Sequence, residues 1–318
     1  MKKISTFVLL LVSITALSQD SQQALLSTGP VSYYKLLQTF NPVPADTDRA
    51  LDTLRFAFSD ETVRGILALK PWYLEGMTEE AFVIPPPPAN SSAQTRAELN
   101  FLLNLQHQRS ALDVESSKVM AGIYYPVNAR PEDAKYELYR RNLFHIGRSI
   151  GTWYTPENLP MTADLFANVC KDAHYFIWQL KLKYARIRPY VLESGIENLE
   201  ETDWAAYPSG HGSNAYISAY ILQKLYPAAS ELFLRDAFEM TRSREILGVH
   251  YPSDGEAARL FARQFVDALF RNEAFLSDFA GVEQEWKQRA FERFEKPVHI
   301  KAGLPGKTES CANKCKSQ

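Results

Sequence analysis

The chain has 318 residues, of which 46% are hydrophobic and 12% are aromatic, so it is long enough to bury a large core. Its 35 basic and 37 acidic residues give a formal net charge of −2. This near-neutral balance disfavours a general nucleic-acid-binding protein, whose binding surface is normally strongly basic.

The N-terminus has the layout of a secretory signal peptide. Two lysines precede a short apolar run from Phe7 to Leu17, and small residues at Ala16 and Ser18 suit cleavage before Gln19. The run is shorter than the roughly 20 residues that a membrane-spanning helix needs. We therefore expect residues 1–18 to be a signal peptide and the mature protein to be periplasmic or secreted, not an integral membrane protein.

Most of the remaining chain has a helical pattern. Apolar residues recur at helical spacing between the prolines and glycines, and runs of alternating β-branched residues are scarce. We expect an all-α fold, with one helical domain over residues 19–300 and a polar tail over residues 301–318. Pro85 to Pro88 predict an exposed extended connector. The expected helices span residues 46–69, 95–119, 132–150, 161–187, 211–226, 229–247, 254–271 and 276–294.

The three cysteines divide between the helical region and the tail. Cys170 lies within an apolar helical pattern, whereas Cys311 and Cys315 lie in the polar C-terminal segment. Secreted proteins permit disulfides, so a local Cys311–Cys315 bridge is one interpretation, and a disordered tail with free thiols is the other. The Cys-x3-Cys spacing has no matching ligands nearby, and we expect no metal site.

The first segment that carries chemistry is KLKYARIRP, from Lys181 to Pro189. Lys181 and Arg188 are seven residues apart, close to two turns of an α-helix, so both would lie on one helical face. Pro189 disfavours helical geometry at Arg188 and would end the helix there. Because Lys183 and Arg186 are charged as well, a solvated basic stripe is the alternative.

The second segment, from Pro208 to His211, leads into an apolar periodic run and predicts a loop that enters a helix. Ser209 suits the N-cap position, and Gly210 lets the backbone approach a ligand closely. The free N–H groups and the positive dipole end of such a helix favour an anion. Helix capping beside an exposed His211 is the alternative.

The third segment runs from Ser243 to Asp254 and contains Arg244 and the sequence GVHYPSD. Asp254 follows His250 by four residues, near enough to accept a hydrogen bond from a ring nitrogen. That bond would fix the tautomer and raise the basicity of the other nitrogen. A helix N-terminus that begins at Pro252 with an acidic first turn would account for the same residues.

In order, the segments read K-x6-RP, PSGH and SR-x5-H-x3-D. This pattern resembles the three-part signature of the type 2 phosphatidic-acid phosphatase superfamily, which includes bacterial class A nonspecific acid phosphatases and vanadium haloperoxidases. Every signature position is filled. The proline-rich stretch from Ile84 to Arg109 also resembles the class A acid phosphatases, and the segment from Gly248 to Arg259 is more similar to the phosphatases than to the haloperoxidases.

The resemblance implies an acid phosphatase that hydrolyses a small-molecule phosphate ester through a phosphohistidine intermediate on His250. His211 would act as general acid and then as general base, and Asp254 would orient His250. Because three cationic side chains would neutralise the phosphate, no metal or other cofactor is expected, and the pair of histidines suggests a mildly acidic optimum. The residues implied in phosphate binding are Lys181, Arg188, Ser209, Gly210 and Arg244.

Other functions share these residues. A vanadium haloperoxidase would hold vanadate as its cofactor, with His250 as the ligand, and a soluble lipid or isoprenoid phosphate phosphatase would use the same chemistry. A non-catalytic phosphate-binding protein is disfavoured, because binding alone needs no nucleophile. Class A relatives often associate as homo-oligomers, but the sequence leaves the oligomeric state and the physiological substrate open. The other histidines, expected to be structural or on the surface, are His107, His145, His174 and His299.

Overall fold

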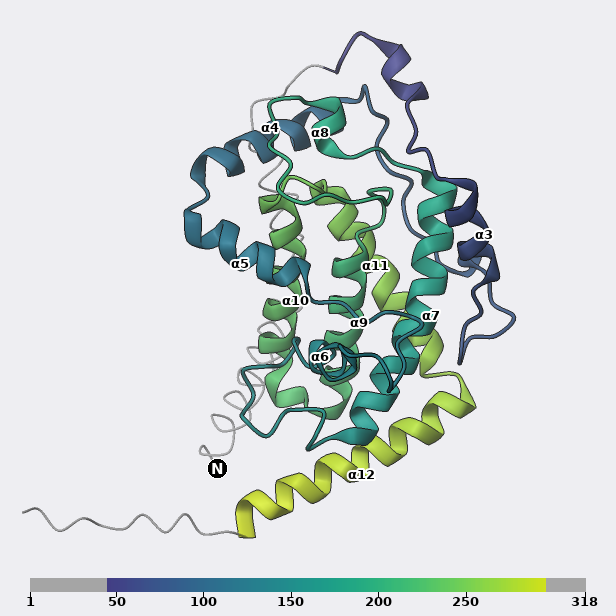
Figure 1. Ribbon diagram of the computed structural model, residues 1–318, viewed down its shortest axis with the longest axis vertical. Helices are drawn as coiled ribbons and strands as arrows, with labels where there is room; N and C mark the ends of the chain where they lie inside the picture. The colour runs from purple at the N-terminus through teal and green to yellow at the C-terminus, as the bar shows by residue number, and fades with distance from the viewer. Residues whose placement is uncertain (1–44, 296–318) are drawn as a thin grey trace, which may run out of the picture.

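The computed structural model describes residues 45–295 (Figure 1). No strand occurs within these residues, which confirms the all-α fold class. The predicted signal peptide, the Cys311–Cys315 pair and the polar tail lie outside the described residues. The α-helices are α3 (Asp60–Ala68), α4 (Ala93–Gln108), α5 (Ala111–Ala121), α6 (Tyr136–Asn142), α7 (Pro160–Tyr184), α8 (Pro189–Leu192), α9 (Gly210–Leu225), α10 (Ser230–Ile246), α11 (Pro252–Leu269) and α12 (Glu273–Glu295), and short 3-10 helices lie at Arg49–Thr53, Glu79–Ala81 and Pro227–Ala229.

Helix α9 lies at the centre of the molecule, between α7 and α10, and it also packs against α11 (Figure 1). The main apolar cluster draws on all four of these helices and includes the fully buried rings of Phe176, Phe233 and Phe261. Helix α12 crosses one end of this bundle and packs against α7 (Figure 1). None of the helices within residues 45–295 combines the length and the apolar character that crossing a bilayer requires.

The ends of α7, α9 and α11 meet at one place. Lys181, in the last turn of α7, donates a hydrogen bond of 2.6 Å to the carbonyl of Ala205, shortly before α9 begins. The backbone N–H of Ser209, the N-cap of α9, donates to the carbonyl of Asp254 in the first turn of α11 at 3.1 Å. The three sequence segments are thereby brought together.

One predicted helix, 95–119, is wrong as a single element, because the chain breaks between α4 and α5. Arg109 is extended, with φ −64° and ψ 136°. The side chain of Ser110 accepts from the N–H of Asp113 at 3.2 Å, and the carboxylate of Asp113 accepts from the N–H of Ser110 at 2.7 Å. This reciprocal capping box satisfies the free N–H groups of a new helix start, so the chain turns there.

The helix predicted over residues 161–187 ends earlier, at Tyr184. Ala185 adopts the left-handed conformation (φ 44°, ψ 40°), and its N–H donates to the carbonyl of Lys181. Arg188 is extended, with φ −76° and ψ 154°. The prediction that Lys181 and Arg188 share one helical face is therefore wrong, although both side chains still reach the same cavity.

Two more predicted helices are shorter than expected. Only Asp60–Ala68 of the predicted 46–69 helix is α-helical, because Ser59 caps a new start through the N–H of Thr62. Only Tyr136–Asn142 of the predicted 132–150 helix is α-helical. Gly147, with φ +92°, adopts a backbone conformation beyond α6 that other residues rarely take. By contrast, α9, α10, α11 and α12 match their predicted ranges to within about three residues.

Candidate active site

A cavity of 470 Å³ lies where the ends of α7, α9 and α11 meet. Six of the eight catalytic and phosphate-binding residues that the sequence analysis named line this cavity. Ser209 and Asp254 do not line it; both are fully buried and lie behind residues that do. The six lining residues are Lys181, Arg188, Gly210, His211, Arg244 and His250.

His250 is 4% exposed, and each of its ring nitrogens has a polar partner. Nδ1 lies 2.9 Å from Oδ2 of Asp254, and Nε2 lies 3.0 Å from Nη1 of Arg188. A guanidinium only donates, so Nε2 accepts and Nδ1–H donates to the carboxylate. Burial and the charge of Arg188 lower the pKa of His250 despite the carboxylate beside it. The ring is therefore a neutral imidazole whose Nε2 accepts from Arg188, and both residues line the cavity.

Asp254 belongs to a buried ion-pair network that the sequence analysis missed. Arg186 donates to Oδ1 of Asp254 at 2.6 Å, to Oε2 of Glu98 at 3.2 Å and to the hydroxyl of Ser253 at 2.7 Å. Its guanidinium lies 3.7 Å from the ring centroid of Tyr251. Although burial alone would raise the pKa of Asp254, Arg186 and His250 hold it well below its usual range. The carboxylate is thus ionised when it orients His250.

Arg186 is 3% exposed, so the alternative interpretation, in which it belongs to a solvated basic stripe, is wrong for this residue. Its two carboxylate partners are 88 and 68 residues away in the sequence, and no local spacing announces them. The only signal within the segment is that Arg186 follows the end of a helix directly and lies between the apolar residues Ala185 and Ile187. Such a residue is positioning rather than catalytic, because it does not line the cavity.

Arg188 and Lys181 line the cavity and donate hydrogen bonds to uncharged oxygen atoms of the protein. Arg188 donates to the carbonyls of Trp204 at 2.8 Å and Val249 at 2.7 Å, and to the hydroxyl of Thr202 at 3.3 Å. Burial lowers the pKa of Arg188 to about 10, and burial and Arg188 together lower the pKa of Lys181. An anion in the cavity would oppose both effects, because it compensates the clustered positive charge.

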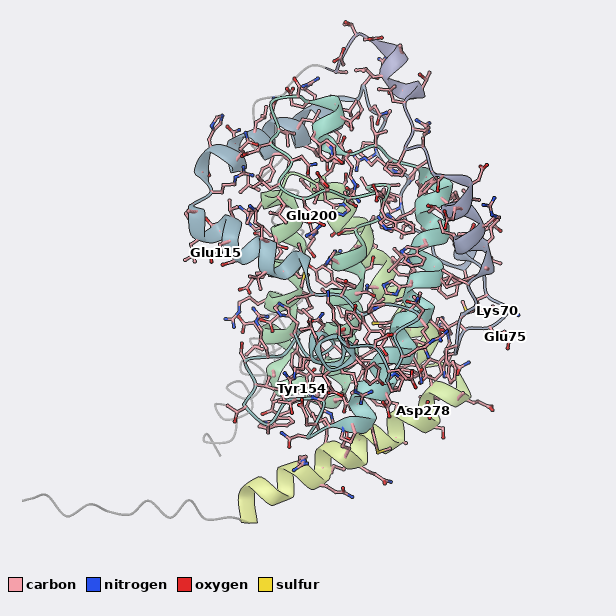
Figure 2. The ribbon with its side chains drawn as sticks, in the orientation of Figure 1. Lys70, Glu75, Glu115, Tyr154, Glu200 and Asp278 are labelled. Atoms are coloured by element: carbon pink, nitrogen blue, oxygen red, sulfur yellow. The ribbon has the colours of Figure 1, made fainter. Side chains whose placement is uncertain are left out.

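Arg244 makes an ion pair with Glu200 through Nη2, and its Nε and Nη1 have no hydrogen-bond partner among the described residues. Figure 2 shows Glu200 over the central helices, away from Lys70 and Glu75 at the edge of the molecule. Glu200 also lines the cavity, together with Glu201 and Asp203 of the same loop. Since Arg244 is only 2% exposed, its free N–H groups are available to a ligand within the protein.

The start of α9 has the local structure that the sequence predicts. The hydroxyl of Ser209 accepts from the N–H of Gly212 at 3.2 Å, which is an N-cap bond. Nε2 of His211 lies 3.1 Å from the carbonyl of Ala121, so this nitrogen carries the proton and donates. Burial, followed by the charge of Arg244, lowers the pKa of His211. In the absence of an anion, His211 and His250 are therefore both neutral.

Two further histidines, expected to be structural or on the surface, also line the cavity: His145 and His174. His174 stacks on Trp178 with a centroid distance of 5.2 Å, and its Nε2 lies 3.5 Å from Nδ2 of Asn214. Burial lowers the pKa of each histidine to about 4. Among the described residues, no three His, Cys, Asp or Glu side chains gather in a way that could hold a metal ion.

The depressed pKa of His174 predicts a loss of stability in mild acid. The unfolded chain takes up a proton near pH 6.5, whereas the folded chain does so only near pH 4, so stability is complete above pH 6.5 and falls as the pH drops through this window. The full difference corresponds to about 3 kcal/mol. Urea unfolding at a series of pH values should show a flatter profile for His174→Gln than for the wild type or for the exposed control His107→Gln. If the free energy of unfolding depends on pH as steeply in His174→Gln as in the wild type, the lowered pKa of His174 is contradicted.

The comparisons with known proteins find similarity to bacterial acid phosphatases over part of the chain. No model of a protein family matches the chain. The chain is 31% identical over 139 residues, 42% of its length, to a non-specific acid phosphatase of Providencia stuartii, and 29% identical over 143 residues, 43% of its length, to one of Salmonella typhi. These matches cover 56% and 57% of the two relatives, so the chain spans just over half the length of the curated relatives it matches.

Among solved structures, a bacterial vanadium-dependent iodoperoxidase overlaps 75% of this chain and 64% of its own, with 16% identity and a TM-score of 0.47. At this level the overlap does not distinguish a phosphatase from a peroxidase. The sequence comparison confirms the resemblance that the three segments indicated: over the matched residues, the chain is similar to curated bacterial non-specific acid phosphatases.

Proposed function

We propose that the protein is an acid phosphatase that hydrolyses small-molecule phosphate monoesters through a phosphohistidine on His250. One observation carries the proposal: a neutral imidazole, held through Nδ1 by a buried carboxylate, lines a cavity that is also lined by Lys181, Arg188 and Arg244. A nucleophile oriented by a third group and surrounded by cations is the arrangement that phosphoryl transfer to a side chain needs.

In the first step, Nε2 of His250 forms a bond to phosphorus while the bond from phosphorus to the ester oxygen breaks. His211, which takes up a second proton from solvent when the dianionic ester binds, gives that proton to the departing alkoxide. In the second step, His211 takes a proton from water, the oxygen of that water bonds to phosphorus, and the N–P bond breaks to release inorganic phosphate. Asp254 stays ionised and stabilises the positive charge that develops on His250.

The phosphoryl oxygens would be held by the three cations and by the positive end of α9, which begins at Gly210. This cationic set supplies the charge neutralisation, so we propose that the reaction requires no metal. A dianionic ester would also raise the pKa of His211, since its charge opposes the effects of burial and Arg244. Binding of the ester and protonation of His211 are therefore coupled, which favours a mildly acidic pH optimum for hydrolysis.

The test is hydrolysis of an aryl phosphate by the purified protein, beside bromide and iodide oxidation with added vanadate. We expect phosphate release without added metal, inhibition by vanadate, and a labelled phosphoryl group on His250 after rapid quenching into alkali. Halide oxidation with no ester hydrolysis would favour the haloperoxidase and overturn the proposal.

The role of His211 predicts a dependence on the leaving group. His211→Ala should lower kcat/KM by about 10²–10⁴-fold for alkyl phosphates, whose alkoxides need a proton, and by less than about tenfold for 4-nitrophenyl phosphate. A series of phenyl phosphates with graded phenol acidity would give the slope against leaving-group pKa. The slope should be steeper for His211→Ala than for the wild type, and parallel lines would remove His211 from the acid role.

A further inference from the structure

The cavity continues well beyond the cationic end. The lining residues of α7 recur on successive turns, at Lys181, Trp178, His174 and Cys170, and this interval corresponds to about 16 Å along the helix axis. On α9 the lining continues from Gly210 to Ser218, an interval of about 12 Å. We call this extension the arm: the part of the cavity lined by residues of segments 121–125, 142–146, 170–178 and 214–218.

The two helical walls of the arm start at the same point and stay together. A side chain at Gly210 would begin 3.9 Å from Cε of Lys181, so α7 and α9 meet at the cationic end. Two turns farther along α7, His174 lies 3.5 Å from Asn214 of α9. The arm therefore leads away from His250 along the groove between α7 and α9.

The arm differs in chemistry from the cationic end. None of the residues that line the arm is Asp, Glu, Lys or Arg. The cationic end, by contrast, is lined by Lys181, Arg188 and Arg244 and by the acidic side chains of the loop from Glu200 to Asp203. The titratable groups of the arm are neutral, because burial lowers the pKa of His145 and His174 to about 4 and raises the pKa of Cys170 to about 12. Its walls are mainly apolar or aromatic, with rings at Tyr124, Tyr125 and Trp178 among them.

We propose that the arm receives the alcohol part of the ester, and that the preferred substrates are phosphate monoesters of uncharged, ring-bearing alcohols. This inference rests on the proposed phosphatase function. The whole cavity is of the size that usually encloses an organic ligand, about 300–1,000 Å³, rather than an isolated phosphate. A second charge on the alcohol would have to enter a wall without a counter-ion, which disfavours diphosphates and phosphorylated sugar acids.

The test compares phenyl phosphate with 4-biphenylyl phosphate, which have leaving groups of similar acidity and differ by one ring. The wild type should hydrolyse the biphenylyl ester with a kcat/KM at least about tenfold higher, because the second ring becomes buried. Ser218→Leu narrows the arm about 12 Å from Gly210. It should lower kcat/KM for the biphenylyl ester much more than for phenyl phosphate and so remove the preference. Ser218→Ala, the matched control, should keep the preference.

The possible results distinguish a failure of this inference from a failure of the proposed phosphatase function. Equal kcat/KM for the two esters in the wild type, a higher value for glycerol phosphate, or an equal loss for both aryl esters in Ser218→Leu would overturn the inference and leave the phosphatase function intact. If Ser218→Leu does not fold, Cys170→Met narrows the same end of the arm from α7, and the wild-type comparison still decides. No hydrolysis of any ester by the folded wild type would instead remove the proposed function, and this inference with it.

Discussion

His250→Ala is expected to abolish measurable phosphatase turnover, with a loss of at least about 10⁴-fold in kcat. The proposed reaction uses Nε2 of His250 as its nucleophile, because Asp254 orients this ring through Nδ1–H, whereas His211 donates through Nε2 to the carbonyl of Ala121. Removing the ring also leaves room for water, but water lacks the oriented lone pair. The measurement is steady-state hydrolysis of 4-nitrophenyl phosphate, with kcat and KM determined separately.

The controls separate chemistry from folding. The exposed variant His107→Ala should keep full activity, and both variants should give a helical circular-dichroism spectrum like that of the wild type. Binding of inorganic phosphate by His250→Ala should persist within about tenfold, because Lys181, Arg188 and Arg244 remain in place. Substantial residual turnover in a folded His250→Ala protein would remove the phosphohistidine route.

Arg186→Met is expected to reduce the free energy of unfolding by about 3–5 kcal/mol. Arg186 is the buried cation between Glu98 and Asp254, both of which are fully buried. Its removal leaves these carboxylates without their main counter-charge in an environment where ionisation is already opposed. For Glu98, burial raises the pKa even with Arg186 present, so loss of the arginine raises it further.

Urea unfolding at pH 7 is the measurement for Arg186→Met, with Arg64→Met as the matched control at an exposed position of α3. The control should change the free energy of unfolding by less than about 0.5 kcal/mol. A double variant with Glu98→Gln should recover part of the loss, since one stranded charge is removed. Equal stabilities for Arg186→Met and Arg64→Met would show that the buried network contributes little.

Local spacing was enough to predict much of the candidate site. The four-residue interval from His250 to Asp254 predicts their hydrogen bond, and the Ser209–Gly210 pair predicts a capped helix start; both interactions occur in the structure. These predictions succeed because each depends on neighbours within one turn of helix. Lys181 and Arg188 were expected to lie together because they would share a helical face, and that reason is wrong. The helix ends before Arg188, at a left-handed residue, Ala185, that no marker in the sequence predicts.

Long-range partners could not be predicted in the same way. Glu98 lies within the predicted helix 95–119 and was not singled out, yet it is fully buried, and its carboxylate accepts from the N–H of Ser253, 155 residues away, at 2.7 Å. The neutral arm likewise combines segments that have no common motif. Ser110 caps the start of α5 and so marks the break between α4 and α5. Because the helical period of apolar residues continues on both sides of Ser110, the sequence pattern does not indicate this break.

Asp254 links the two histidines through different atoms of one residue. Its carboxylate holds the ring of His250, and its main-chain carbonyl accepts from the N–H of Ser209, two residues before His211. The ring of His250 and the backbone at the start of α9 are therefore both tied to the first turn of α11. In the proposed reaction, a shift of the first turn of α11 would therefore act on the ring of His250 and on the helix start that carries His211 at the same time.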